Sequence, residues 1–207
     1  MKQNYDAVLF DLLSALIDSW SLWDDLAGGS RPGRTWRMHY LNATCRSGSY
    51  YPYLSLVGDS AQAVGIPRSR ASGLGKRWKE LEPWPEATRL LSSLARKTRI
   101  GIVTNCSEAL GSQCAESLGT PFDVVVTAER AGYYKPDPRI YEQAIAEIGV
   151  APERILYVAG SPFDVGGANA VGMPTYWHNR IGLIDTKASS LAINSSASLD
   201  GVLDHIL

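Results

Sequence analysis

Short apolar runs alternate with helix-like segments through the second half of the chain. Regular alternation of this kind predicts a parallel sheet covered by helices on both faces. Parallel sheets bind ligands beyond the carboxyl ends of their strands, so the loops after residues 10, 104, 127 and 159 are where we expect a site. The expected strands are 100–104 (IGIVT), 124–127 (VVVT), 155–159 (ILYVA) and, more weakly, 173–177 (MPTYW), and the expected helices are 108–118, 138–148 and 164–171.

The N-terminal run 7–10 (AVLF) predicts one more buried strand, which ends at Asp11. The chain between Asp11 and Asn105, just past the next clear strand, is far longer than one crossover helix requires. Residues 16–82 are aromatic-rich and helix-like, and 82–85 (EPWP) has the stiffness of a return linker. We therefore predict an α/β core domain formed by residues 1–15 and 83–207, with a helical cap domain, 16–82, inserted over the carboxyl edge of the sheet.

Composition excludes several classes of function. Twenty Lys and Arg face 21 Asp and Glu, so there is no basic excess for a nucleic-acid partner. Hydrophobic residues make up 45% of the chain, which suffices for a folded core. Cys45, Cys106 and Cys114 are odd in number and lack CxxC spacing, which disfavours a disulfide framework or a zinc ribbon. The N-terminus resembles neither a signal peptide nor a membrane span, so we expect a soluble cytoplasmic protein without a membrane partner.

Polar residues follow the first two predicted strands. Asp11 comes directly after the first, where a carboxylate can act in catalysis or cap the following helix. Thr104 and Asn105 end the second, and their hydroxyl and amide groups can donate to an anionic oxygen. Asn105 can equally form a capping box with Glu108.

Two further charged residues occupy similar positions. Lys135 precedes two prolines in 132–138 (GYYKPDP), a stiff loop that would hold a lysine beside a carboxylate and keep that carboxylate ionised. The alternative is an ordinary solvated lysine. Asp164 follows the glycine turn after the strand 155–159, where it can act in the site or cap the next helix.

The order of these residues resembles the haloacid dehalogenase superfamily over nearly the whole chain, and in particular its L-2-haloacid dehalogenases. Trp36-Arg37 resembles the arginine that binds the substrate carboxylate in that branch. Tyr141 matches its tyrosine near the nucleophile, and 174–182 (PTYWHNRIG) resembles its strand ending in an asparagine–arginine–x–glycine turn.

The resemblance implies a Rossmann-like core with a helical cap and covalent catalysis by Asp11. It makes Lys135 the charge partner of Asp11, and Asp164 the residue that holds Lys135 and helps to activate water. No metal or organic cofactor is implied, and Mg²⁺ would enter only for a phosphatase. The implied substrate-binding residues are Arg37, Leu13, Ser14, Thr104, Asn105, Tyr141 and Ser161.

Departures from the family pattern separate the possible reactions. Phosphatases of the superfamily carry an acid two residues after the nucleophile and another where Gly160 stands, but this chain has Leu13 and Gly160. A halide leaves without a proton, whereas the leaving group of a phosphate ester needs a proton, which Leu13 cannot supply. With Gly160 in place of an acid, a magnesium ion would also lose one oxygen ligand. The tyrosine–glycine–threonine of dehalogenases is replaced by Leu13-Ser14-Ala15, so a hydroxyl is missing or has moved to Ser14.

The expected activity is hydrolysis of a small 2-substituted carboxylic acid, above all a 2-haloacid, through an ester on Asp11. One alternative is a magnesium-dependent phosphatase. Another is a catalytically impaired relative that acts as a binding protein, because Ala159 and Ser161 replace the serine and asparagine that orient water in dehalogenases. Tyr133, Tyr134 and the cap aromatics could form a homodimer interface, although core packing is the favoured interpretation.

Overall fold

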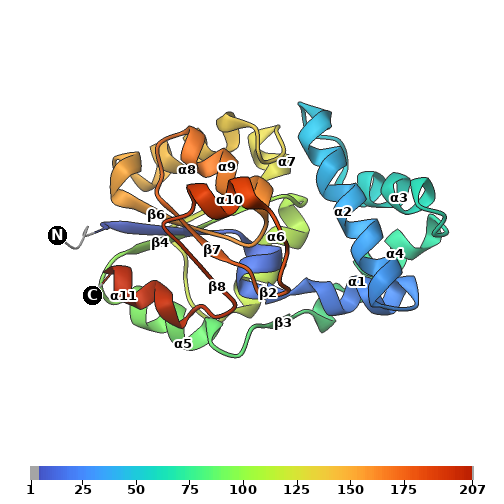
Figure 1. Ribbon diagram of the computed structural model, residues 1–207, viewed down its shortest axis with the longest axis horizontal. Coiled ribbons are helices and arrows are strands. Elements are labelled where there is room, and N and C mark those ends of the chain that lie inside the picture. Colours follow the sequence, from blue (N-terminus) through green and yellow to red (C-terminus); the bar gives the residue numbers. More distant parts are fainter. Residues whose placement is uncertain (1–4, 207) are drawn as a thin grey trace.

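Residues 5–206 are described by a computed structural model, and among them six parallel strands form one sheet (Figure 1). The sheet order is β5-β4-β1-β6-β7-β8. This confirms the predicted α/β, Rossmann-like class. The strands are β1 (Ala7–Phe10), β4 (Arg99–Thr104), β5 (Val124–Thr127), β6 (Ile155–Ala159), β7 (Thr175–His178) and β8 (Asn194–Ser196).

Helices cover both faces of this sheet, as Figure 1 shows. Side chains alternate between the faces of a strand, so Val8 and Phe10 pack in one apolar cluster with α5, while Ala7 and Leu9 pack in another with α8 and α9. The helices around the sheet are α5 (Ala87–Leu94), α6 (Glu108–Ser117), α7 (Ala128–Ala131), α8 (Pro138–Ile148), α9 (Pro162–Ala170), α10 (Thr186–Leu191) and α11 (Leu203–Ile206), with short 3-10 turns η3 (Pro152–Arg154) and η4 (Asp200–Val202).

Several element bounds differ from the expected ones. Helix α9 begins at Pro162 rather than at residue 164, because Ser161 caps it and proline suits the first turn of a helix. Strand β7 begins at Thr175, after Pro174. Strand β8 lies within a Ser-rich stretch that showed no strand pattern, because it is a polar edge strand with little apolar surface to bury.

The inserted helical layer lies at one end of the molecule in Figure 1. The chain enters and leaves it through an antiparallel pair, β2 (Ile17–Asp18) and β3 (Glu82–Pro83). The domain bounds at residues 16 and 82 remain predictions. The layer consists of α1 (Ser19–Ala27), α2 (Ser30–Ser47), α3 (Tyr53–Ala63), α4 (Ser69–Lys76) and the 3-10 turn η2 (Trp78–Glu80).

The aromatic side chains of the insertion form its interior. Trp23 packs on Trp36 with ring centroids 4.5 Å apart and on Tyr40 at 5.4 Å, and Tyr53 packs edge-on against Tyr40 and Trp78. All five rings are buried within the chain, in keeping with the favoured core interpretation. No helix within residues 5–206 is long and apolar enough to span a membrane.

Candidate active site

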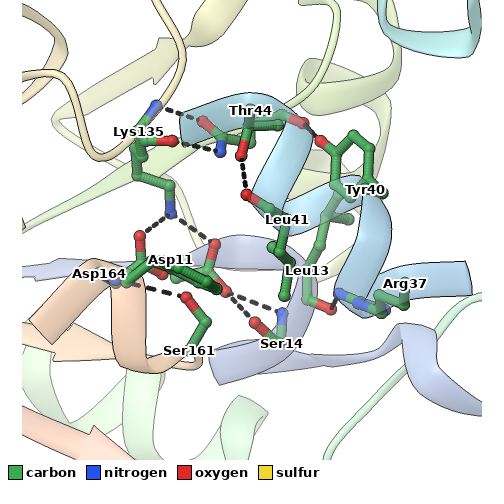
Figure 2. A pocket seen from close by; sticks show the side chains of 12 residues that line it. Asp11, Leu13, Ser14, Arg37, Tyr40, Leu41, Thr44, Lys135, Ser161 and Asp164 are labelled. Carbon is green, nitrogen blue, oxygen red and sulfur yellow. Dashed lines mark hydrogen bonds and ion pairs between the residues drawn. The ribbon is translucent and has the colours of Figure 1, made fainter. Parts of the chain in front are cut away.

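A small cavity lies beyond the carboxyl ends of the central strands, beneath α2 (Figure 2). Its volume is about 30 Å³, room for about one water molecule. Both the α/β core and the inserted helical layer contribute to the cavity wall, because α2 of the layer covers the core loops that follow β1, β4 and β6. The lining residues are Asp11, Leu13, Ser14, Arg37, Tyr40, Leu41, Thr44, Asn105, Lys135, Ser161, Phe163 and Asp164.

Asp11 is held by the turn that follows it. This turn is η1 (Leu12–Leu16), a short π-helix that Asp11 caps. Its Oδ2 accepts hydrogen bonds from the Ser14 amide at 2.9 Å, the Ser14 hydroxyl at 2.6 Å and the Ala15 amide at 3.1 Å. Asp11 thus combines the capping role with a place in the cavity wall, and the hydroxyl beside it is supplied by Ser14.

Lys135 lies between two carboxylates, as Figure 2 shows. Its Nζ is 2.7 Å from Oδ1 of Asp11 and 3.1 Å from Oδ1 of Asp164, and it donates to the Tyr157 hydroxyl at 3.2 Å. The side chain is 2% exposed, so the alternative of a solvated surface lysine is wrong. Asn105 fixes this loop, because its Oδ1 accepts from the Lys135 amide at 2.7 Å and its Nδ2 donates to the Lys135 carbonyl at 3.1 Å.

The charges of this cluster set the pKa values of its members. Burial opposes ionisation of Asp11, but the charge and hydrogen bond of Lys135 and the Ser14 hydroxyl outweigh it, so the pKa of Asp11 lies below its ordinary value. Burial, together with the charge of Asp11, raises the pKa of Asp164 to about 6 although Lys135 opposes the rise. Burial acts to lower the pKa of Lys135, yet the two carboxylates raise it above its usual value. At neutral pH the cluster holds one cation and two anions.

Three residues expected to touch substrate have other contacts. Thr104 is fully buried and lies outside the cavity lining, with its hydroxyl 3.6 Å from the sulfur of Cys106. Tyr141 also lies outside the lining and donates to Oδ1 of Asp164 at 3.2 Å. Asn105 borders the cavity, but its amide is occupied by Lys135. In this structure Asn105 and Tyr141 support Lys135 and Asp164, and the substrate contacts expected of Thr104, Asn105 and Tyr141 stay predictions.

The alternative capping roles of Asn105 and Asp164 are not observed. Ser107 caps α6 and Ser161 caps α9, where the Ser161 hydroxyl accepts from the Asp164 amide at 3.3 Å. This leaves the carboxylate of Asp164 free for Lys135 and the cavity.

The sequence pattern of haloacid dehalogenase-like hydrolases matches residues 5–172. The chain belongs to this family of hydrolases. It is 27% identical to haloacetate dehalogenase H-2 of Moraxella sp. (strain B), over 87% of this chain and 88% of that protein. It is 25% identical to (S)-2-haloacid dehalogenase H-109 of Pseudomonas putida, over 99% of both chains.

Solved structures share the fold of this haloacid dehalogenase-like hydrolase. The crystal structure of a dehalogenase with an intermediate complex superposes with a TM-score of 0.84 at 23% identity, covering 99% of this chain and 98% of the other. The L-2-haloacid dehalogenase of Xanthobacter autotrophicus with chloropropionic acid covalently bound superposes with a TM-score of 0.79 at 21% identity, covering 96% of each chain.

Arg37 reaches the cavity of this hydrolase from α2. The side chain is buried, its Nη2 donates to the Leu13 carbonyl at 3.1 Å, and its Nη1 donates to the Ser19 hydroxyl. The guanidinium lies 4.2 Å from the ring centroid of Trp20. Its Nε has no hydrogen-bond partner among residues 5–206, which leaves one buried donor available.

Sequence reasoning missed several residues of the site. Leu41 and Thr44 line the cavity from α2, and Phe163 lines it from α9. A helical period could have found the first two, because they share a face with Arg37 at i+4 and i+7. Tyr157 gave no such signal, since a tyrosine within an apolar strand is ordinary core composition.

Gly160 occupies the position at which phosphatases of the superfamily carry their second acid. A side chain here would place its Cβ 2.3 Å from the Ser14 hydroxyl oxygen and 2.5 Å from the Ala15 amide nitrogen. An acidic residue at this position would displace the turn that holds Asp11. Position 160 therefore cannot supply the second acid of a phosphatase without a change in the turn that holds Asp11. Residues 5–206 also contain no group of three His, Cys, Asp or Glu residues placed to hold a metal ion.

Proposed function

We propose that this hydrolase removes halide from a small 2-haloacid through an ester on Asp11, without a metal or organic cofactor. The observation that carries the proposal is the unequal environment of the two Asp11 oxygens. Oδ2 is fixed by three donors, whereas Oδ1 contacts a single donor among residues 5–206, the Lys135 ammonium. Oδ1 therefore retains the more available lone pairs and is the nucleophile.

The first half-reaction is a displacement at C2 of the substrate. The bond from Oδ1 to C2 forms as the carbon–halogen bond breaks, and the halide leaves with the bonding electron pair. A halide needs no proton, so the apolar Leu13 is no impediment. Arg37 is suited to binding the substrate carboxylate, because its Nε–H has no acceptor in the described part of the chain and each terminal nitrogen keeps a second N–H, so two hydrogen bonds to a carboxylate are available. The guanidinium also lies over the Trp20 ring, which shields it from water.

The second half-reaction hydrolyses the ester. Water attacks Cγ of Asp11, and negative charge develops on Oδ2, where the Ser14 amide, the Ser14 hydroxyl and the Ala15 amide already donate. Asp164, whose pKa is about 6, is ionised at neutral pH and can take the proton from the water. The Cγ–Oδ1 bond then breaks, and Oδ1 leaves with the product. The proton held by Asp164 passes to Oδ1, which gives the hydroxyl group of a 2-hydroxy acid.

The compared relatives support a small substrate. Haloacetate and (S)-2-haloacids are the compounds after which the two compared dehalogenases are called. The proposed route also gives the buried Lys135 a role. Its charge stabilises the Asp11 carboxylate before that carboxylate attacks C2 of the substrate.

A single turnover in ¹⁸O-labelled water with enzyme in excess tests the proposal. The ester route predicts unlabelled product from the first turnover and ¹⁸O in the peptide that contains Asp11, because the solvent oxygen enters at Cγ. It also predicts inversion at C2. Labelled product with an unlabelled peptide would show that Asp11 acts only as a general base.

Two controls address the other possible functions. Asp11→Asn should abolish halide release, because an amide is a far poorer nucleophile. The unmodified protein should not hydrolyse p-nitrophenyl phosphate with or without Mg²⁺. Strong magnesium-dependent hydrolysis would favour the phosphatase, and absence of every turnover would favour the binding protein.

A further inference from the structure

The turn that holds Asp11 is itself held by hydrogen bonds from outside it. The indole Nε1 of Trp84 donates to the Ser14 carbonyl at 3.1 Å, and its backbone amide donates to the Leu16 carbonyl at 2.9 Å. The Nδ1 atom of His178 lies 2.8 Å from the Ala15 carbonyl. Three consecutive carbonyls of η1 are thus bound by Trp84 and His178.

Trp84 acts on the same peptide unit that contacts Asp11. The Ser14 carbonyl and the Ala15 amide belong to one planar peptide group, so fixing the direction of the carbonyl also fixes the direction of the N–H. That N–H donates to Oδ2 of Asp11. A hydrogen bond to the carbonyl also polarises the peptide group and strengthens donation by its N–H.

We propose that Trp84 is a positioning residue for ester hydrolysis, which it serves by orienting and polarising the Ser14–Ala15 peptide group toward Oδ2 of Asp11. His178 supports the same turn at the next carbonyl. The proposal rests on the ester route of the proposed function. Neither residue lines the cavity, so neither is expected to contact substrate.

The two half-reactions should respond differently to loss of this support. Negative charge grows on Oδ2 when water attacks the ester, and the Ala15 amide is then required most. During ester formation, Oδ1 attacks and Oδ2 loses negative charge, so weaker donation to Oδ2 does not slow the step. A purely structural role for Trp84 would instead impair both steps together.

The test replaces Trp84 with Phe, which removes the indole N–H and keeps a ring beside Arg180 and His178. Rapid quenching and mass spectrometry of the intact protein then follow the ester through a single turnover of bromoacetate. We expect Trp84→Phe to form the ester at the rate of the unmodified enzyme, to hydrolyse it roughly fivefold to tenfold more slowly, and to leave kcat/KM, which reports the steps up to ester formation, unchanged. Equal slowing of both steps, or an unchanged hydrolysis rate, would overturn the proposal.

Trp78→Phe is the matched control. Its indole also donates to a backbone carbonyl, that of Leu110 at 2.9 Å, and it is likewise buried, but the carbonyl that it binds belongs to α6 and not to η1. This variant should hydrolyse the ester at the unmodified rate. If Trp78→Phe slows ester hydrolysis as much as Trp84→Phe does, loss of any buried indole hydrogen bond is enough to slow this step, and the specific role of Trp84 is rejected.

His178 provides a second pair of variants should Trp84→Phe fold poorly. His178→Phe removes the group that binds the Ala15 carbonyl, whereas His178→Gln retains a donor. We expect slow ester hydrolysis in the first and recovery in the second, and identical rates in both would contradict the inference. If the unmodified enzyme releases halide and no ester forms, the proposed function fails at its first step, which is a separate outcome from normal hydrolysis in these variants.

Discussion

At the scale of single residues, the site depends on one buried cation shared by two carboxylates. Lys135 uses Asp11, Asp164 and Tyr157 as acceptors for its three protons. Removing one partner of a buried ion pair costs more than the pair contributes, because the remaining charge is left without compensation. This arrangement leads to a prediction about stability and a second about catalysis.

Lys135→Met should lower the free energy of unfolding at pH 8 by about 3–5 kcal/mol. Without the cation, both buried carboxyls would have pKa values raised above those of the unfolded chain. A raised carboxyl pKa means that the folded state binds protons more tightly, so the loss should shrink as pH falls from above 6 towards the ordinary carboxyl value of 3.8. Urea unfolding at pH 8 and pH 5 measures this, with exposed Lys97→Met as the control. A loss independent of pH would contradict the ion-pair account.

The pH dependence of ester hydrolysis should follow Asp164. Its pKa is about 6 while Asp11 is charged, and esterification of Asp11 removes that charge, so the pKa of Asp164 in the ester should lie below 6. We expect the rate to be constant around neutral pH and to decline by about tenfold per pH unit once the pH falls below that lowered pKa. Stopped-flow single turnovers test this, and Asp164→Asn should give a slow profile without the same inflection.

At the scale of elements, α2 determines how much space the substrate has. Arg37, Leu41 and Thr44 lie along one face of this helix and line the cavity. In the proposed function, the helix would supply a charged group for the carboxylate of the substrate and an apolar wall for its carbon chain.

Leu41→Ala should shift preference towards longer 2-haloacids. Removing the larger side chain makes room for added methylene groups, so the ratio of kcat/KM for 2-bromobutanoate to that for bromoacetate should rise by about tenfold. Leu54→Ala, in α3 and outside the cavity lining, is the matched control. A ratio that rises equally in both variants would show that general loosening of the cap, and not the cavity wall, sets chain-length preference.

At the scale of the whole molecule, the strand pattern predicted the fold because strand–helix alternation permits few arrangements. It also predicted where Asp11, Lys135 and Asp164 meet, because the ends of parallel strands share one edge. It did not predict the contacts of Thr104, whose methyl group packs towards Gly111 of α6. Which way a strand-end side chain points depends on packing across the sheet. The support from Trp84 escaped prediction for a similar reason, since it joins residues distant in sequence.

The close approach of Gly160 to the Asp11 turn has a consequence for how this chain could change through evolution. Leu13 borders the cavity, so an acid there could arise by substitution at one position. An acid at position 160 could not, because a Cβ there would meet the Ser14 and Ala15 backbone that cradles the nucleophile. A variant that acquires the acid at position 160 before the acid at position 13 would lose the proposed dehalogenation before it gained phosphatase activity. Two chemistries on one fold are therefore separated by a steric barrier that no single replacement crosses.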